Sequence, residues 1–312
     1  MPNVSLICTV YNEEKTISPF LESVAAQTRI PNEIIIVDGG SIDGTFETLK
    51  KAKKKYPHLN LKVFREKSNR SKGRNVAITK AKYQVIAITD AGCILDALWL
   101  ESLVKLYMQT NVDIVSGYYR AEPQTAFEAA VVPFVLVMPD AVDPLSFLPA
   151  TRSVLLRSAV FKKVGLFDES LELSEDFVFF KTARQLGCTF AFAKDATVVW
   201  IPRTSLQSFF RMVRGMAESD VLGGVLRTKA ILVVARYLFF IGLFVGGLFL
   251  AASFWVVLIL LLAAYSLWAV MKNSRYVAPR SYLWLLVLQY TADYAVIVGT
   301  LGGYARKARV SL

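Results

Sequence analysis

The chain has 312 residues, of which 54% are hydrophobic, and its mean hydropathy is +0.42. This composition is too apolar for an ordinary soluble protein, and the length allows two domains. The formal net charge is +11, but most basic residues cluster where a chain would lie against an anionic membrane or bind phosphates, so we expect no nucleic-acid partner.

The reactive side chains are few. A single histidine, His58, lies in a lysine-rich segment, so any catalysis must rely on carboxylates and cations. The three cysteines suit neither a zinc site nor a disulfide framework, which agrees with a reducing compartment. The N-terminus lacks a basic segment followed by an apolar core, so we expect no signal peptide and a cytoplasmic location for residues 1–225.

The N-terminal part alternates between two kinds of segment. Apolar strand patterns occupy 4–10, 32–40, 61–66 and 84–90, and helical patterns occupy 13–27, 43–56 and 71–81. This alternation predicts an α/β fold with a mostly parallel sheet flanked by helices. In such sheets ligands bind beyond the carboxyl ends of the strands.

Polar residues follow three of these predicted strands. They are Thr9, Tyr11 and Glu13 at the first strand, Asp38 at the second and Asp90 at the fourth. We therefore predict a nucleotide-binding crevice there, where Gly39 lets a ligand approach the backbone. A dinucleotide-binding fold is disfavoured because no G-x-G-x-x-G turn follows the first strand.

The C-terminal part is dominated by apolar runs. They are long enough for transmembrane helices at about 231–250, 253–271 and 282–304, which predicts a helical membrane domain over 226–312. A buried helical hairpin of a soluble protein is disfavoured, because such helices rarely run this long without a polar face. Before them, residues 204–218 interleave apolar side chains with arginines, a pattern typical of an interfacial amphipathic helix.

The charge distribution leaves the membrane topology open. Two spans would return the basic loop 272–280 to the cytoplasm, as positive residues prefer. A third span would place the basic tail 306–309 outside. Either the last apolar segment, with Asp293 in its middle, is re-entrant or packed obliquely, or the tail is tolerated outside.

Several motifs occur in a fixed order along residues 3–215. They read LICTVYNEE, NEIIIVDGGSIDGT, KGRNVAI, AITDAGC and LELSEDFVFFKTARQLG. In this order they resemble the family-2 glycosyltransferases with the GT-A fold. The resemblance implies an inverting transfer of a sugar from a nucleotide-sugar donor.

The resemblance also implies donor contacts at matching positions. The residues that would line the nucleotide pocket are Thr9, Tyr11, Glu13, Asp38 and Gly39. Lys72 and Arg74 would lie near the diphosphate, and Arg211 and Arg214 lie in a segment that could close over the phosphates. Arg211 and Arg214 can equally snorkel to lipid headgroups.

The catalytic and metal positions follow from the same resemblance. Asp176 matches the catalytic base, with Glu175 beside it, although Ser174-Glu175-Asp176 is also a good helix start. Asp90 occupies the first position of the D-x-D motif and would hold Mg²⁺ or Mn²⁺, facing an open, phosphate-bearing pocket. The second aspartate of that motif is replaced by Gly92.

Together these features predict a membrane-anchored glycosyltransferase that acts on a hydroxyl of a lipid-linked or other membrane-borne acceptor, in glycan, polysaccharide or glycolipid assembly. A polyprenyl-phosphate glycosyltransferase is an alternative, since an anionic phosphate acceptor needs no base. A non-catalytic membrane-anchored nucleotide-sugar-binding protein is another, motivated by Gly92 and by Trp200, which stands where the family often has a histidine. The sequence indicates no oligomeric state.

Overall fold

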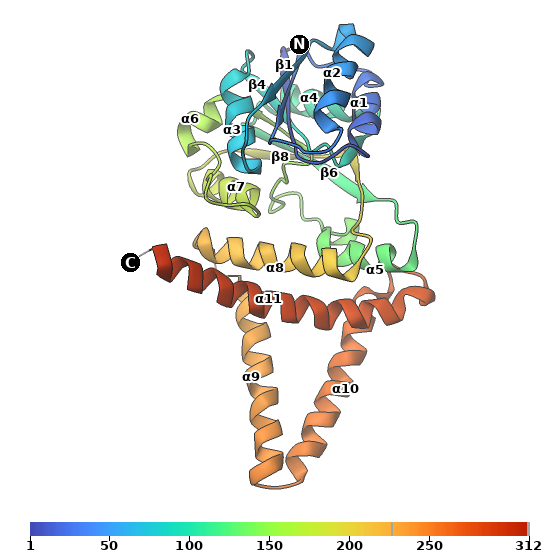
Figure 1. The fold of residues 1–312 in the computed structure, drawn as a ribbon, viewed down its shortest axis with the longest axis vertical. Coiled ribbons are helices and arrows are strands. Elements are labelled where there is room, and N and C mark those ends of the chain that lie inside the picture. Colours follow the sequence, from blue (N-terminus) through green and yellow to red (C-terminus); the bar gives the residue numbers. More distant parts are fainter. Residues whose placement is uncertain (226, 311–312) are drawn as a thin grey trace. The chain divides into compact units, whose positions relative to one another are not determined.

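The chain folds into two compact units. A computed structural model describes residues 1–225 and 227–310 (Figure 1). The first unit comprises Met1–Glu122 and Met138–Ile201, and the second comprises Pro123–Val137 and Pro202–Leu312. The second unit thus includes two helices, near residues 130 and 214, that the sequence-based division at residue 225 placed in the N-terminal domain.

The first unit is built on an eight-stranded sheet with the order β3-β2-β1-β4-β7-β6-β8-β5. The strands are β1 (Val4–Val10), β2 (Glu33–Asp38), β3 (Leu61–Arg65), β4 (Val85–Ile88), β5 (Cys93–Leu95), β6 (Ile114–Ala121), β7 (Val154–Arg157) and β8 (Phe190–Trp200). The first four in this order are parallel, as predicted. The sheet as a whole is mixed, because β7 runs antiparallel to both β4 and β6.

Helices flank this sheet on both faces. They are α1 (Ile17–Ala25), α2 (Thr45–Lys55), α3 (Arg70–Lys80), α4 (Trp99–Thr110), α6 (Ala159–Val164) and α7 (Glu175–Gln185), with short 3-10 turns η1 (Pro57–Leu59) and η2 (Pro139–Ala141). Helices α3, α6 and α7 pack on one face, and α1, α2 and α4 lie on the other (Figure 1). All of β2 is buried, as expected for a Val- and Ile-rich strand covered on both faces.

The second unit is entirely helical among its described residues. It contains α5 (Ala126–Val135), α8 (Leu206–Leu222), α9 (Thr228–Phe249), α10 (Ser253–Ser274), the 3-10 turn η3 (Pro279–Ser281) and α11 (Tyr282–Val310). Three of these segments are long and apolar enough to cross a membrane: α9, α10 and Pro279–Arg309. They coincide with the three apolar segments predicted from the sequence.

Helices α8 and α11 pack side by side (Figure 1). Two glycines of α11 make this close approach possible. A Cβ added at Gly299 would lie 2.3 Å from the carbonyl oxygen of Arg214, and one at Gly303 would lie 2.7 Å from Cβ of Val221. The missing side chains therefore let the two backbones touch.

This contact predicts opposite effects for two Gly→Ala substitutions. Gly299→Ala should destabilise the protein by about 1–3 kcal/mol, because the new methyl group overpacks the α8 contact. Gly242→Ala on α9 is the matched control, since its added Cβ meets no described atom within 4 Å. Alanine favours the helix there, so thermal unfolding in detergent should show no loss. Equal melting temperatures for both variants would contradict the tight contact.

Candidate active site

The loops that follow β1 and β2 are joined at the carboxyl edge of the sheet. The backbone N–H of Asn12 donates to Oγ of Ser41 over 2.9 Å, and that of Glu13 donates to Oγ1 of Thr45 over 2.8 Å. Tyr11 is exposed between them. The structure therefore brings the residues predicted to line the nucleotide pocket to one edge.

Asp38 is fully buried at the end of β2. Its carboxylate accepts hydrogen bonds from the Ser41 N–H at 3.2 and 3.3 Å, and Nε of Arg65 lies 3.2 Å away. Arg65 also donates to the Ser41 carbonyl and stacks over the ring of Phe46. Asp38 thus shapes the loop after β2 together with Arg65, which the sequence reading did not single out.

Arg65 could have been found from the strand pattern. It ends β3 and pairs in register with Asp38 on the neighbouring parallel strand. Its guanidinium lies beside the pocket loop and keeps almost half of its side chain exposed, so it can reach a bound ligand.

The central charged feature is a buried guanidinium between two carboxylates. Arg74 on α3 is 1% exposed, and its Nη2 lies 2.7 Å from Oδ1 of Asp90. Its Nη1 donates to Oε1 of Glu175, which is 2% exposed at the start of α7. This arrangement joins the end of β4 to the first turn of α7.

The pKa shifts follow from this geometry. Burial opposes the charge of Arg74, but the attraction of Asp90 and Glu175 outweighs it and raises the pKa of Arg74. Burial would also raise the pKa of Asp90, but Arg74 outweighs it and lowers that pKa. For Glu175 burial dominates, and its pKa is raised although Arg74 acts against it. Asp90 is therefore the carboxylate that stays ionised most easily.

Asp90 differs from its two partners in exposure. Its side chain is 26% exposed, so the carboxylate is paired with Arg74 and remains partly accessible to solvent. The charges of Arg70 and Arg152 also lower the Asp90 pKa. The guanidinium of Arg152 lies over the rings of Tyr119 and Trp200. Neither arginine was singled out from the sequence, because each approaches Asp90 only in the folded chain.

Asp176 lies beside the buried pair and is half-buried. Its Oδ1 accepts from the N–H of Phe177 at 2.8 Å, and its Oδ2 lies 3.4 Å from the N–H of Thr151. Ser174, just before α7, adopts a left-handed backbone with φ +60° and makes no side-chain cap with the described residues. This conformation is uncommon for a non-glycine residue, and such outliers cluster at functional sites.

The other predicted residues lie further from this cluster or in the other unit. The side chain of Lys72 on α3 is partly exposed. Its Nζ lies 3.0 Å from Oε1 of Glu66. Thr9 contacts α3, since a Cβ at Gly73 would lie 2.9 Å from its Cγ2. Arg211 and Arg214 are on α8 in the second unit, so their predicted role at the phosphates stays a prediction.

The metal-binding capacity of this edge is limited. Within residues 1–225 and 227–310, no three His, Cys, Asp or Glu side chains converge in a way that could hold an ion. Asp90 nevertheless fits a shared site, because Mg²⁺ or Mn²⁺ can take one carboxylate and complete its coordination with phosphate oxygens and water. The residues therefore suit an ion held jointly with a diphosphate.

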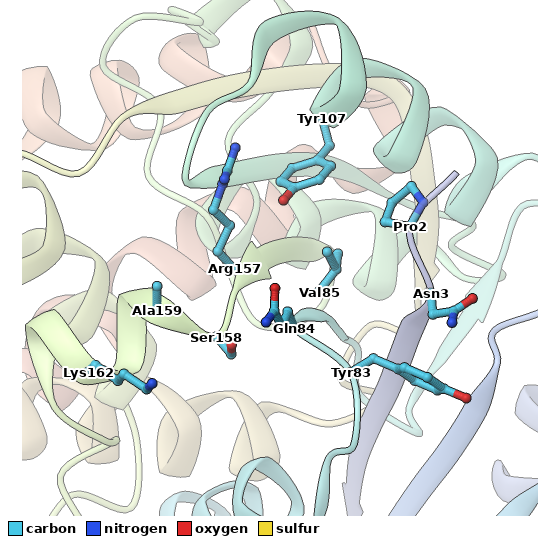
Figure 2. A pocket seen from close by; sticks show the side chains of 10 residues that line it. All are labelled: Pro2, Asn3, Tyr83, Gln84, Val85, Tyr107, Arg157, Ser158, Ala159 and Lys162. Atoms are coloured by element: carbon cyan, nitrogen blue, oxygen red, sulfur yellow. The ribbon is translucent and has the colours of Figure 1, made fainter.

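A separate cavity lies at the opposite edge of the sheet. It has a volume of about 500 Å³ and is lined by Pro2, Asn3, Tyr83, Gln84, Val85, Tyr107, Arg157, Ser158, Ala159 and Lys162 (Figure 2). Asn3 precedes β1 and Val85 begins β4, so the cavity is at the amino ends of these strands. Ligands of such sheets bind at the other end, and we do not place the donor there.

Comparison with known proteins agrees with this geometry. Residues 5–141 match the model of Glycosyl transferase family 2. Glycosyltransferase AglE of Haloferax volcanii is 29% identical over 200 residues, covering 62% of this chain and 66% of the relative. The poly(ribitol-phosphate) beta-N-acetylglucosaminyltransferase TarS of Staphylococcus aureus is 28% identical over 191 residues, covering 57% of this chain and 32% of the relative.

A solved structure extends the similarity to most of the chain. The mannosyltransferase PcManGT from Pyrobaculum calidifontis, in complex with GDP-Man and Mn²⁺, has a TM-score of 0.69 at 18% identity, covering 96% of this chain and 87% of that one. The fold is therefore of the GT-A type found in nucleotide-sugar transferases. Residues 5–141 therefore match a glycosyltransferase domain of family 2, and apolar helices follow in the C-terminal part of the chain. The matches span less than two thirds of the length of the curated relatives.

The buried charges predict unequal effects of two substitutions on α3. Arg74→Met should cost about 3–5 kcal/mol, because it leaves two largely buried carboxylates without their cation. Lys72→Met is the matched control: its ion pair with Glu66 is exposed, and such pairs contribute about 0–1 kcal/mol. Chemical denaturation of the detergent-solubilised protein measures both. A loss below 1 kcal/mol for Arg74→Met would contradict the proposed importance of the bridge.

Proposed function

We propose that this protein is a membrane-anchored inverting glycosyltransferase that moves a sugar from a nucleotide-sugar donor to a hydroxyl of a membrane-borne acceptor. The observation that carries the proposal is the half-buried Asp176, placed beside the fixed Glu175–Arg74–Asp90 bridge. Neighbours of the same fold support the donor class, since they were solved with GDP-Man and with UDP-GlcNAc.

In this proposal Asp176 acts as the general base. It takes the proton from the acceptor hydroxyl, and the oxygen attacks the anomeric carbon from the face opposite the nucleotide. The bond from that carbon to the diphosphate breaks, and the leaving nucleoside diphosphate keeps its electrons. Glu175 and Arg74 are positioning residues, because they are buried and fix the first turn of α7 that presents Asp176.

The leaving group gathers negative charge, which needs cations nearby. Arg70 and Arg152 act electrostatically on Asp90 and could serve this purpose together with Lys72. A divalent ion at Asp90 would add positive charge against the diphosphate when it is bound. The neighbour solved with Mn²⁺ supports a divalent cation in general.

Chain connectivity favours a membrane-borne acceptor. Strand β6 runs parallel to β8, with Ala121 paired to Trp200, and both strands end at the same edge of the sheet as β4. That edge carries Asp90. The chain enters the second unit directly after these strand ends, at Pro123 and at Pro202. Two connections to the helical unit, after β6 and after β8, therefore start at the edge where chemistry is proposed.

The same helices support attachment to a membrane. The basic residues beside them suggest on which side of the membrane the glycosyltransferase domain lies. Lys229 lies at the start of α9, and Lys272 and Arg275 lie at the end of α10. Because positive residues remain on the cytoplasmic side, the glycosyltransferase domain would face the cytoplasm.

The general-base role predicts a large loss of activity in Asp176→Asn. Nucleoside diphosphate release, measured with GDP-mannose and with UDP-N-acetylglucosamine in the presence of membrane lipid extract, should fall by about 100-fold to 10,000-fold. Asp195→Asn, an exposed position on β8, is the control and should leave the rate unchanged.

Two results would overturn the proposal in different ways. Full activity of Asp176→Asn would point to an acceptor that is already anionic, as in a polyprenyl-phosphate glycosyltransferase. Donor binding by the wild type without any release above background would point to a non-catalytic nucleotide-sugar-binding protein.

A second prediction concerns the metal. The same two donors should raise the melting temperature more with Mn²⁺ than without it, because ligands that bind only the folded state stabilise it. Asp90→Asn should abolish the Mn²⁺-dependent part of the shift, while Asp195→Asn should retain it. If the donors raise the melting temperature of the wild type equally with and without Mn²⁺, the arginines and not a metal ion would neutralise the charge of the diphosphate.

A further inference from the structure

The last apolar helix, α11, differs in composition from α9 and α10. Its most apolar stretch has a mean hydropathy of 1.3, against 2.2 for α9 and 2.3 for α10. A larger share of that stretch is also buried, 33% against 11% and 17%. All three segments are long and apolar enough to span a membrane, but α11 is less apolar and more buried than α9 and α10.

Their directions within the second unit differ as well. Helices α9 and α10 form a hairpin, and both of its arms extend from the same side of α11. Helix α11 itself runs across the direction of the arms, beside α8 (Figure 1). Each arm of the hairpin has 22 residues, or about 33 Å of helix, which is enough for a hydrocarbon core of about 30 Å. If the arms cross a bilayer, α11 lies along its surface.

A polar cluster fixes α11 where it crosses the hairpin. Asp293 is 2% exposed, and its carboxylate accepts hydrogen bonds from Arg236 of α9 at 2.9 Å and from Tyr265 of α10 at 2.6 Å. Nearby, Nζ of Lys272 donates to Gln289, which itself donates to Asp293. Such a cluster is expensive in the centre of a bilayer but tolerable near its surface, where long basic side chains reach the headgroups.

Aromatic side chains that favour a membrane surface occur along the whole length of α11. Tyrosine and tryptophan prefer the membrane–water interface. In α11 they are spread from one end to the other, at Tyr282, Trp284, Tyr290, Tyr294 and Tyr304. A spanning helix would concentrate them near its two ends.

The placement of charge agrees with this arrangement. Residues 237–271, which include the turn between α9 and α10, have no charged side chain. Basic residues instead lie at the open end of the hairpin, in the loop 272–280 and in the last turns of α11. Arg306 in those turns lies 2.6 Å from Glu218 of α8. With α11 on the surface, all of these cations are on one side of the membrane.

We propose that α9 and α10 cross the bilayer as a hairpin, while α11 lies in the interface on the side where α9 begins and α10 ends. The bilayer surface is then the partner of α11, and the C-terminal end of α11 stays on the side of the loop 272–280. This inference does not depend on the transfer reaction, since it rests on the second unit alone.

Three single-cysteine additions test the arrangement. Ala251→Cys lies in the hairpin turn, Ala278→Cys between α10 and α11, and Ala308→Cys at the end of α11, and all three positions are exposed. The native Cys8, Cys93 and Cys188 are buried, so the unmodified full-length chain serves as the labelling background. A membrane-impermeant maleimide is applied to right-side-out and to inverted vesicles.

The expected result is labelling of Ala278→Cys and Ala308→Cys from the same side and of Ala251→Cys from the opposite side. Labelling of Ala308→Cys together with Ala251→Cys would overturn the proposal, because α11 would then span. Labelling of all three from one side would also overturn it, because the hairpin would then not cross. Neither result would bear on catalysis, which Asp176→Asn tests separately.

Discussion

The candidate site depends on one buried guanidinium that two carboxylates share. Arg74 contacts Asp90 and Glu175, which are 16 and 101 residues away along the chain. Breaking such a pair is costly because the remaining charge stays buried. The bridge therefore fixes three elements relative to one another: α3, the end of β4 and the start of α7. In the proposed reaction, the groups assigned to the donor and to the acceptor would share this rigid support, as a transfer with aligned reactants requires.

In the proposed site, the same bridge would compensate for having one aspartate in place of two. Two carboxylates would repel each other unless an ion lay between them. With Gly92 at the second position, Asp90 already has a permanent cation in Arg74 and feels Arg70 and Arg152. The edge thus keeps an ionised, partly exposed carboxylate without a bound metal. Arginines can also bind phosphate oxygens in pairs, so a diphosphate would meet several fixed cations there.

The sequence predicted the strands and helices that local residue patterns encode. It missed side-chain partners and helix directions that depend on contacts between distant parts of the chain. Runs of Val and Ile located β1, β2 and β4, and long apolar stretches located α9, α10 and α11. The parallel prediction held for the four strands where strands and helices alternate, but not after residue 90, where that alternation ends. Arg152 was missed because it acts on Asp90 only in the folded chain, whereas the register of the predicted strands β2 and β3 already pointed to Arg65. Hydropathy also contains no information on direction, so it could not show that α11 runs across α9 and α10.

The chain leaves the first unit twice, each time at the carboxyl edge of the sheet. This edge carries Asp38 and Asp90, and the chain leaves it after β6 and after β8 for the helical unit. Helix α8, the first element after β8, packs along α11 rather than along the hairpin that follows it. If α11 lies in the interface, α8 does too, because the two helices pack along each other.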